Sequence, residues 1–129
     1  MILIFGGAYQ GKLAYAMERF NLTESSVYRC DDSNVDIPDN KKAVYETDKW
    51  ILALIKAGKT NAEIEQTVQQ FILEHRDSVV ICNDISCGVV PTDPVLRKWR
   101  EAVGRTLALC AQNSEEVIRL FCSIPTRLK

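Results

Sequence analysis

The sequence predicts an α/β fold in three layers, with a mainly parallel central sheet. Two observations support this fold class. Short apolar runs rich in β-branched residues alternate with stretches of helical periodicity, an order typical of parallel sheets with helices on their faces. The first apolar run, residues 2–5, ends at glycines and leads directly into a helical stretch. Ligands of such folds bind beyond the carboxyl ends of the strands.

The expected strands are residues 2–5, 26–30, 43–46, 78–82 and 116–122. Helices are expected at 12–20, at 48–57 with Gly58 as the C-terminal cap, and from Thr60, where Glu63 completes a capping box. A last helix starts at 92–94, with Pro94 in its first turn. Residues 31–42 are polar and should form a loop. We expect residues 1–129 to form one domain.

Composition excludes several classes of protein. The net charge of −1 gives no indication of a nucleic-acid surface, and no apolar run approaches the roughly 18 residues of a membrane span. The amino-terminal residues lack the basic leader of a signal peptide. Five cysteines, several of them in apolar runs, are typical of buried thiols in a reducing cytoplasm. Cys82 and Cys87 are poorly spaced for a zinc site, and His75 is the single histidine.

The glycine-rich stretch after the first strand has the spacing of a P-loop. Gly6 and Gly11 bracket four residues and Lys12 follows. Glycines let the backbone N–H groups curl around an anion, the helix N-terminus adds its positive dipole end, and the lysine reaches the outer phosphates. A chance match is the alternative. The residues expected to bind ATP or GTP are Gly6, Gly7, Ala8, Tyr9, Gln10, Gly11, Lys12 and Leu13.

A weakened Mg²⁺ site is also expected. P-loop proteins carry Ser or Thr after the lysine as a Mg²⁺ ligand, whereas Leu13 has no side-chain oxygen and should pack against the sheet. Asp84 follows the strand at 78–82, where P-loop folds place an acidic residue that holds Mg²⁺ or a water on it. We therefore expect Lys12 and Asp84 to be catalytic and Asp84 to be the metal ligand. The alternative is that Asp84 only caps a turn.

The segment 83–129 resembles the carboxyl-terminal part of the bifunctional adenosylcobinamide kinase/adenosylcobinamide-phosphate guanylyltransferases. The family's Asn-Glu-Val-Gly-x-Gly-Ile-Val-Pro stretch is similar to residues 83–91, Asn-Asp-Ile-Ser-Cys-Gly-Val-Val-Pro. A following helix with Arg, an aromatic and Ala-Gly-Arg is similar to the one containing Arg97, Trp99, Gly104 and Arg105. The family's Gly-Gly-Ala-Arg-Ser-Gly-Lys resembles "GGAYQGK".

The resemblance implies a kinase that moves the terminal phosphoryl group of ATP or GTP to a corrinoid hydroxyl, with cobinamide as partner. It also implies a homo-oligomer, because family members form rings of three subunits. The family's guanylyl-accepting histidine on an Arg-rich helix has no counterpart in this shorter chain, so guanylyl transfer is not expected. Two alternatives stay open: a nucleotide-binding module that has lost efficient turnover, and a structural partner of a complete enzyme.

Other candidates have weaker support. Asp31 and Asp32 could approach the crevice or belong to a solvated loop. Arg97 and Arg105 could reach phosphate or form an exposed helix face. We expect His75 to be a surface residue near a helix end. Trp50 and Trp99 are expected to pack in the core or an interface, while Tyr9 and Gln10 either touch substrate or face water.

Overall fold

The computed structural model describes residues 1–86 and 88–129. Its centre is a six-stranded sheet in the order β2-β3-β4-β1-β5-β6. The strands are β1 (Ile2–Gly6), β2 (Val27–Arg29), β3 (Ala43–Tyr45), β4 (Val79–Asn83), β5 (Glu116–Phe121) and β6 (Ile124–Arg127). All neighbouring strands pair in parallel except β5 and β6, which form an antiparallel hairpin. The sheet is therefore mainly parallel, as predicted.

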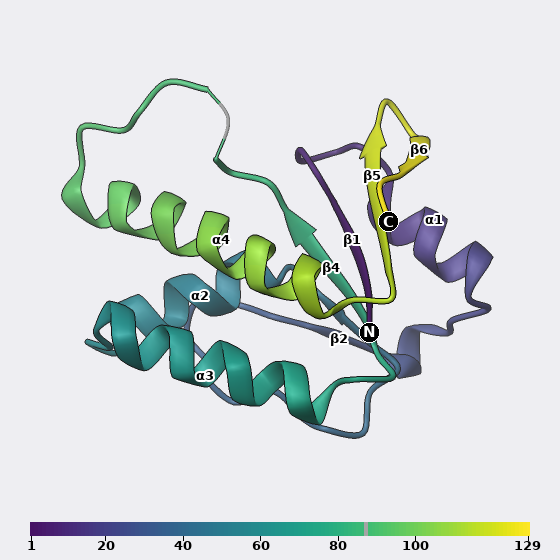
Figure 1. Cartoon of the computed structure of the whole chain (residues 1–129), viewed down its shortest axis with the longest axis horizontal. Helices are drawn as coiled ribbons and strands as arrows, with labels where there is room; N and C mark the ends of the chain where they lie inside the picture. Colours follow the sequence, from purple (N-terminus) through teal and green to yellow (C-terminus); the bar gives the residue numbers. More distant parts are fainter. Residues whose placement is uncertain (87) are drawn as a thin grey trace.

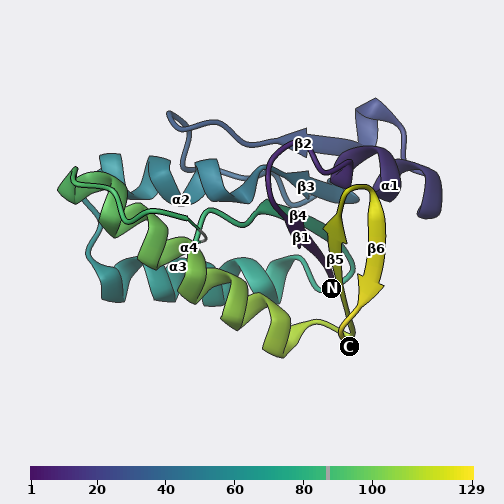
Figure 2. The same ribbon diagram turned by 90° about the horizontal axis from the view of Figure 1, so that it is seen from above.

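The helices are divided unequally between the two faces of the sheet (Figure 1). Helices α2 (Thr47–Lys56), α3 (Asn61–Glu74) and α4 (Pro94–Asn113) lie together on one face, and α1 (Lys12–Arg19) lies on the other. Figure 2 shows α1 and the β5–β6 hairpin at the opposite end of the molecule from the start of α4. A 3₁₀ turn, η1 (Glu24–Ser26), leads into β2. The three-layer P-loop-type fold predicted from the sequence is confirmed.

Each face of the sheet has its own apolar core. Side chains from α2, α3 and α4, including Ile51, Val68 and Val103, pack on the face to which Leu3 and Val80 point. The core under α1 is smaller. It contains Ile4, Ala16, Ile81, Ile118 and Leu120. Alternate residues of β1 and β4 thus enter opposite cores, because neighbouring side chains of a strand point to opposite faces. Both faces of these central strands are covered, which explains their continuous apolar sequence.

The predicted elements are present, with ends shifted by one or two residues. Glu63 and Thr60 form the expected reciprocal capping box at the start of α3. Gly58 follows α2 with φ +83°, the left-handed conformation expected of a helix-terminating glycine. The strand β6 was not predicted. All four of its residues are exposed and it contains Pro125, so it lacks the alternating pattern that identifies a half-buried strand.

The cysteines behave as the composition suggested. Cys30, Cys82 and Cys110 are buried free thiols, and burial raises the pKa of Cys30 and of Cys110 to about 12. Cys122 is exposed, whereas Cys87 lies outside the described residues. In the part of the chain that the structure describes, no helix has the length and apolar character needed to cross a bilayer.

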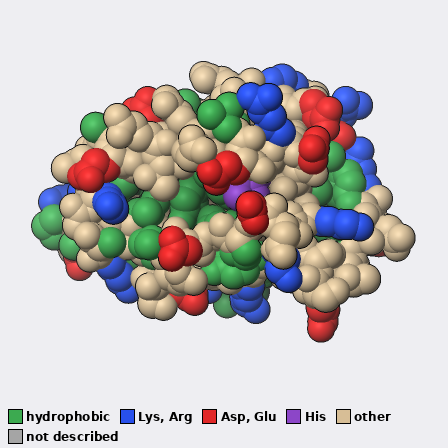
Figure 3. Space-filling model, turned by 90° about the horizontal axis from the view of Figure 1, so that it is seen from below, with side chains coloured by type: hydrophobic (Ala, Val, Ile, Leu, Met, Phe, Trp, Pro, Cys, Tyr) green, Lys and Arg blue, Asp and Glu red, His purple; other side chains and the backbone are tan. Residues whose placement is uncertain are grey.

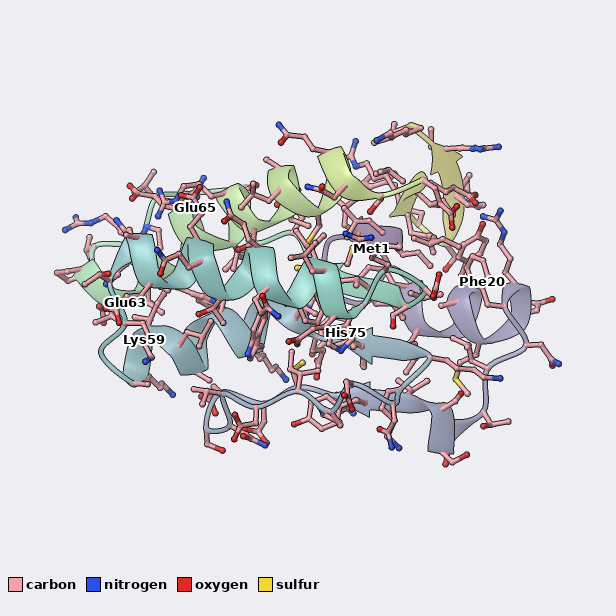
Figure 4. The ribbon with its side chains drawn as sticks, turned by 60° about the horizontal axis from the view of Figure 1, so that its bottom comes forward. Met1, Phe20, Lys59, Glu63, Glu65 and His75 are labelled. Atoms are coloured by element: carbon pink, nitrogen blue, oxygen red, sulfur yellow. The ribbon has the colours of Figure 1, made fainter. Side chains whose placement is uncertain are left out.

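The prediction of a surface position for His75 is wrong. The side chain is 2% exposed and lies at the carboxyl end of α3 (Figure 4). Its Nδ1 is 2.9 Å from the carbonyl oxygen of Phe71, its Nε2 is 3.4 Å from that of Pro38, and its ring stacks on Phe71 at 4.3 Å. The space-filling view shows only a small part of the histidine, between acidic side chains (Figure 3). The loop 31–42 folds over the helix end and buries it, a tertiary contact that local sequence does not reveal.

We expect His75→Ala to lower the free energy of unfolding by about 2–4 kcal/mol, since it removes a stacked buried ring and leaves a cavity. Urea denaturation followed by circular dichroism measures the change. The neighbouring Arg76 is exposed, so Arg76→Ala is the control and should change stability by no more than about 0.5 kcal/mol. Equal stability of the two variants would contradict the buried position.

Candidate functional site

The glycine-rich turn lies at the carboxyl end of β1, between β4 and β5. Gly6 is the last residue of β1, and a Cβ added to it would come 2.3 Å from the carbonyl oxygen of Leu120 in β5. Gly11 has φ +83°, and an added Cβ would lie 2.7 Å from the Oγ of Ser123. Close approach to the backbone of Leu120 therefore requires glycine at position 6, and the left-handed φ favours glycine at position 11, where a side chain would also displace the Ser123 hydroxyl. The contacts with the hairpin and the left-handed φ of Gly11 thus account for the two glycines whose spacing predicted a P-loop.

The hairpin also binds the turn through hydrogen bonds. The backbone N–H of Ser123 donates to the carbonyl oxygen of Gln10 over 3.1 Å, and the N–H of Cys122 donates to the side-chain oxygen of Gln10. Gln10 therefore supports the turn, in addition to lying on the cavity beside it. Tyr9 is fully exposed and has φ 59°. Its left-handed backbone is uncommon for a residue with a side chain and completes the curl of the loop.

Lys12 is the first residue of α1 and is only 4% exposed. Its Nζ donates a 2.6 Å hydrogen bond to the carbonyl oxygen of Gly7, so the ammonium lies inside the loop. Burial lowers the pKa of Lys12, while the carboxylates of Asp48 and Glu46 act in the opposite direction without cancelling the effect. A bound polyphosphate would favour the charged ammonium more strongly than the loop carbonyl does.

A cavity of about 570 Å³ opens in front of the loop, at the carboxyl ends of β1, β2, β3 and β4. Residues 8–14 form one wall, and Asp84 and Trp99 lie on another. This volume is within the range of small-molecule sites. The structure thus brings residues 8–13 of the predicted P-loop and Asp84 to one cavity, while Gly6 and Gly7 are not on its lining.

Two acidic residues that the sequence analysis did not select also line this cavity. Glu46 and Asp48 follow β3 and begin α2. Asp48 is 2% exposed and accepts hydrogen bonds from the backbone N–H and the side-chain amide of Asn83, at 3.1 and 3.3 Å. Burial raises the pKa of Asp48, although the bonds from Asn83 oppose this shift. The available signal was the two acidic residues that follow β3 directly, at positions 46 and 48.

Glu46 is bound by two cations. Its carboxylate contacts Arg29 Nε at 2.7 Å and Lys49 Nζ at 3.1 Å. Burial acts to raise the pKa of Glu46, but the hydrogen bonds from Arg29 and Lys49 outweigh it and hold the pKa below its usual value. The residue has φ 58°, a strained backbone for glutamate. This strain and the ion pairs position one ionised carboxylate beside the cavity.

Asp84 is both a cavity residue and a turn residue. Its Oδ1 accepts hydrogen bonds from the backbone N–H and the hydroxyl of Ser86, at 3.0 and 2.5 Å. Asp84 therefore does cap a turn, as the alternative predicted. The two bonds from Ser86 also fix the orientation of its carboxylate. No group of three or more His, Cys, Asp or Glu side chains in residues 1–86 and 88–129 could hold a metal ion. A nucleotide-bound Mg²⁺ needs only one or two carboxylates, which this cavity can supply.

Of the remaining candidates, Asp31, Asp32 and Trp50 are not on the cavity lining, whereas Trp99 is. Asp31 accepts hydrogen bonds from Ser33 and Asn34, and Asp32 pairs with Lys56 at 2.5 Å. Residues 31–42 contain no helix or strand, so the prediction of a loop is confirmed. Trp50 is a buried core residue. Trp99 packs against the same core and lines the cavity, donating its indole N–H to the carbonyl oxygen of Asp48 at 2.7 Å.

Leu13 packs against the core beneath α1, as predicted, and also lies on the cavity wall. His75 is outside this site. It precedes β4, and the backbone of Ser78 in the same connection accepts from Ile2 at the start of β1. The histidine is therefore at the edge of the sheet where the central strands begin, opposite the loop that follows β1.

A comparison with protein-family models matches residues 39–128 to the family described as "cobinamide kinase / cobinamide phosphate guanyltransferase". The chain belongs to this family. Membership implies a cobinamide kinase/guanylyltransferase-type role in cobalamin biosynthesis and nucleotide substrates. A search of curated proteins finds no match for the chain. The matched region starts after the P-loop, so the assignment of residues 6–13 depends on their geometry.

The contact between the loop and the hairpin can be measured by comparing two glycines with equal φ. Gly11 and Gly58 both have φ +83°, but a Cβ at Gly58 would meet nothing within 4 Å. We expect Gly58→Ala to destabilise the chain by about 1–2 kcal/mol through backbone strain. Gly11→Ala should cost about 1–3 kcal/mol more, because Ser123 blocks the new methyl group.

Thermal or urea denaturation of both variants measures these costs, and Ser123→Gly completes a double-mutant cycle. Removing the Ser123 side chain in the Gly11→Ala background should recover the additional loss. Independent, additive effects of the two substitutions would show that the hairpin does not restrict the loop.

Proposed function

We propose that the chain binds ATP or GTP at residues 6–13 and transfers the terminal phosphoryl group to a cobinamide hydroxyl. The observation that supports this best is the position of the buried Lys12 inside a glycine turn whose cavity also contains Asp84, Asp48 and Glu46. Backbone N–H groups and the N-terminus of α1 would surround the β-phosphate, and Lys12 would stabilise the charge that develops during transfer. The acceptor would approach from the side of Arg29 and Lys49.

Asp84 is the residue we assign to hold Mg²⁺ or a water on it, and Asp48 is a buried carboxylate on the lining of the same cavity. Bound Mg²⁺ would supply positive charge that offsets the charge of the phosphates. The chain's own part is to position a carboxylate, through Ser86 for Asp84 and through Asn83 for Asp48. The absence of a hydroxyl at Leu13 supports a weakened metal contribution.

We also propose that the chain does not accept a guanylyl group on histidine. Its only histidine is His75, which is buried beneath residues 31–42 and lies at the edge of the sheet opposite the P-loop. A second candidate function is a nucleotide-binding module with little turnover. The missing hydroxyl at Leu13 favours this second function. A kinase assay with cobinamide separates the two, because only an active enzyme would transfer phosphate to it. Assembly into a homo-oligomer stays a prediction from the family resemblance, as does a cytoplasmic location.

Lys12→Ala should weaken ATP and GTP binding by roughly 10–100-fold, the effect expected for loss of a charge-assisted hydrogen bond to phosphate. Isothermal titration calorimetry measures the change. Lys56→Ala is the control, since Lys56 pairs with Asp32 outside the cavity and its loss should leave affinity unchanged. Nucleotide binding that survives Lys12→Ala at full strength would exclude the assignment of the loop.

Mg²⁺ should add little to nucleotide affinity in the wild type, and Leu13→Ser should increase that dependence because it restores a hydroxyl ligand. Titrations with and without Mg²⁺ measure the difference. The substitution should also cost on the order of 2 kcal/mol of stability, because Leu13 packs on the core, so melting curves are recorded in parallel. Strong Mg²⁺-dependent binding and rapid turnover of cobinamide by the wild type would contradict the weakened site.

A further inference from the structure

A second cavity, of about 380 Å³, lies on α4 beside the segment that joins β4 to α4. Its charged lining consists of Arg97, Arg100, Arg105 and Glu101. Three guanidinium groups against one carboxylate leave an excess of positive charge. The cavity therefore favours an anion of small size.

The arginines in this cavity retain donors for a ligand. Within the described ranges, the guanidinium of Arg97 has no hydrogen-bond or ion-pair partner, and only its backbone N–H is bonded, to the carbonyl oxygen of Asp93. Arg105 is 4.0 Å from Glu101 in an exposed pair, an arrangement that contributes little. Arg100 uses its Nη2 to bind the carbonyl oxygens of Ser86 and Gly88, at 2.5 and 3.1 Å. Its Nη1 is buried and has no partner among residues 1–86 and 88–129. Such a donor is unfavourable until it meets an acceptor.

Gly104 is the second observation that points to a ligand. It lies inside α4 and on the cavity lining, where glycine is less favourable than alanine. A Cβ added at Gly104 would meet nothing within 4 Å, so packing within the described chain does not require the glycine. The missing side chain exposes helix backbone between Arg97, Arg100 and Arg105. This geometry leaves space for a group that approaches the helix closely.

We propose that this cavity binds the phosphate group of a small molecule at a site separate from the P-loop. A phosphate monoester carries up to two negative charges, and its oxygens match the forked donors of guanidinium groups. The site is adjacent to the P-loop cavity, because Ser86 contacts both Arg100 and Asp84. The phosphate could belong to a phosphorylated acceptor or to a nucleotide. Both present the same phosphate oxygens to the guanidinium groups.

The test titrates the full chain with inorganic phosphate, GMP and cobinamide phosphate by calorimetry. The double variant Arg97→Gln/Arg105→Gln should weaken binding of the preferred compound at this site at least tenfold, as expected for lost charge-assisted hydrogen bonds. Gly104→Ala should weaken it by filling the cavity while melting no lower than the wild type. Arg76→Gln, an exposed arginine elsewhere, is the control and should bind as the wild type does.

Lys12→Ala separates this proposal from the proposed function. Phosphate binding that persists in Lys12→Ala and is lost in the arginine double variant supports a second site, whatever nucleotide affinity the P-loop shows. Tighter binding of cobinamide phosphate than of GMP would identify the acceptor as the source of the phosphate, and the reverse order would identify the nucleotide. The proposal is overturned if none of the three compounds binds, if Lys12→Ala abolishes all binding, or if the arginine double variant matches the wild type.

Discussion

The contact between the glycine turn and the β5–β6 hairpin is the constraint on which the site depends. A Cβ at Gly6 would clash with the backbone of Leu120, and a Cβ at Gly11 would displace the hydroxyl of Ser123. Gln10 and Ser123 then join the two segments by hydrogen bonds. The chain brings segments more than 100 residues apart into this contact, since Gln10 and Cys122 are separated by 112 positions. The shape of the phosphate loop is therefore a tertiary property, although its sequence signal is local.

Charge distribution in the P-loop cavity follows from the sheet order. β4 lies beside β1 and β3 lies beside β4, so the residues that follow these strands meet at one edge. Lys12 enters from the first segment, Asp84 from the second, and Glu46 and Asp48 from the third. One buried ammonium thus shares the cavity with several carboxylates. Burial lowers the pKa of Lys12 and raises the pKa of Asp48, so it favours the neutral form of both groups. A bound triphosphate would supply an anion for Lys12, and its metal ion would supply a cation for the carboxylates.

The sequence was sufficient for the fold because its signals were periodic. The apolar strands at the centre, the capping box at Thr60 and the glycine after α2 all act over a few residues and can be recognised without the rest of the chain. The same logic predicted a glycine turn after the first strand and an acidic residue, Asp84, after the strand at 78–82, and the structure places both on one cavity. That logic did not locate β6, whose exposed residues carry no alternation, or the burial of His75, which depends on a contact with Pro38 at a separation of 37 residues. Glu46 and Asp48 were missed because a short strand followed by acidic residues is an ordinary pattern.

The position of His75 has a consequence for how the two activities in the family name apply to this chain. A kinase site needs a phosphate loop, a cation and room for an acceptor, and the P-loop cavity offers all three. Covalent guanylyl transfer through histidine needs a nucleophilic ring nitrogen near the same phosphates. Here both ring nitrogens face backbone carbonyl oxygens beneath residues 31–42, at the edge where the central strands begin. Moving His75 to the P-loop would require α3 and the start of β4 to leave the core that contains Phe71 and Ile72. The cost of exposing that core is the physical reason why we propose phosphoryl transfer, and no guanylyl transfer to His75, for this chain.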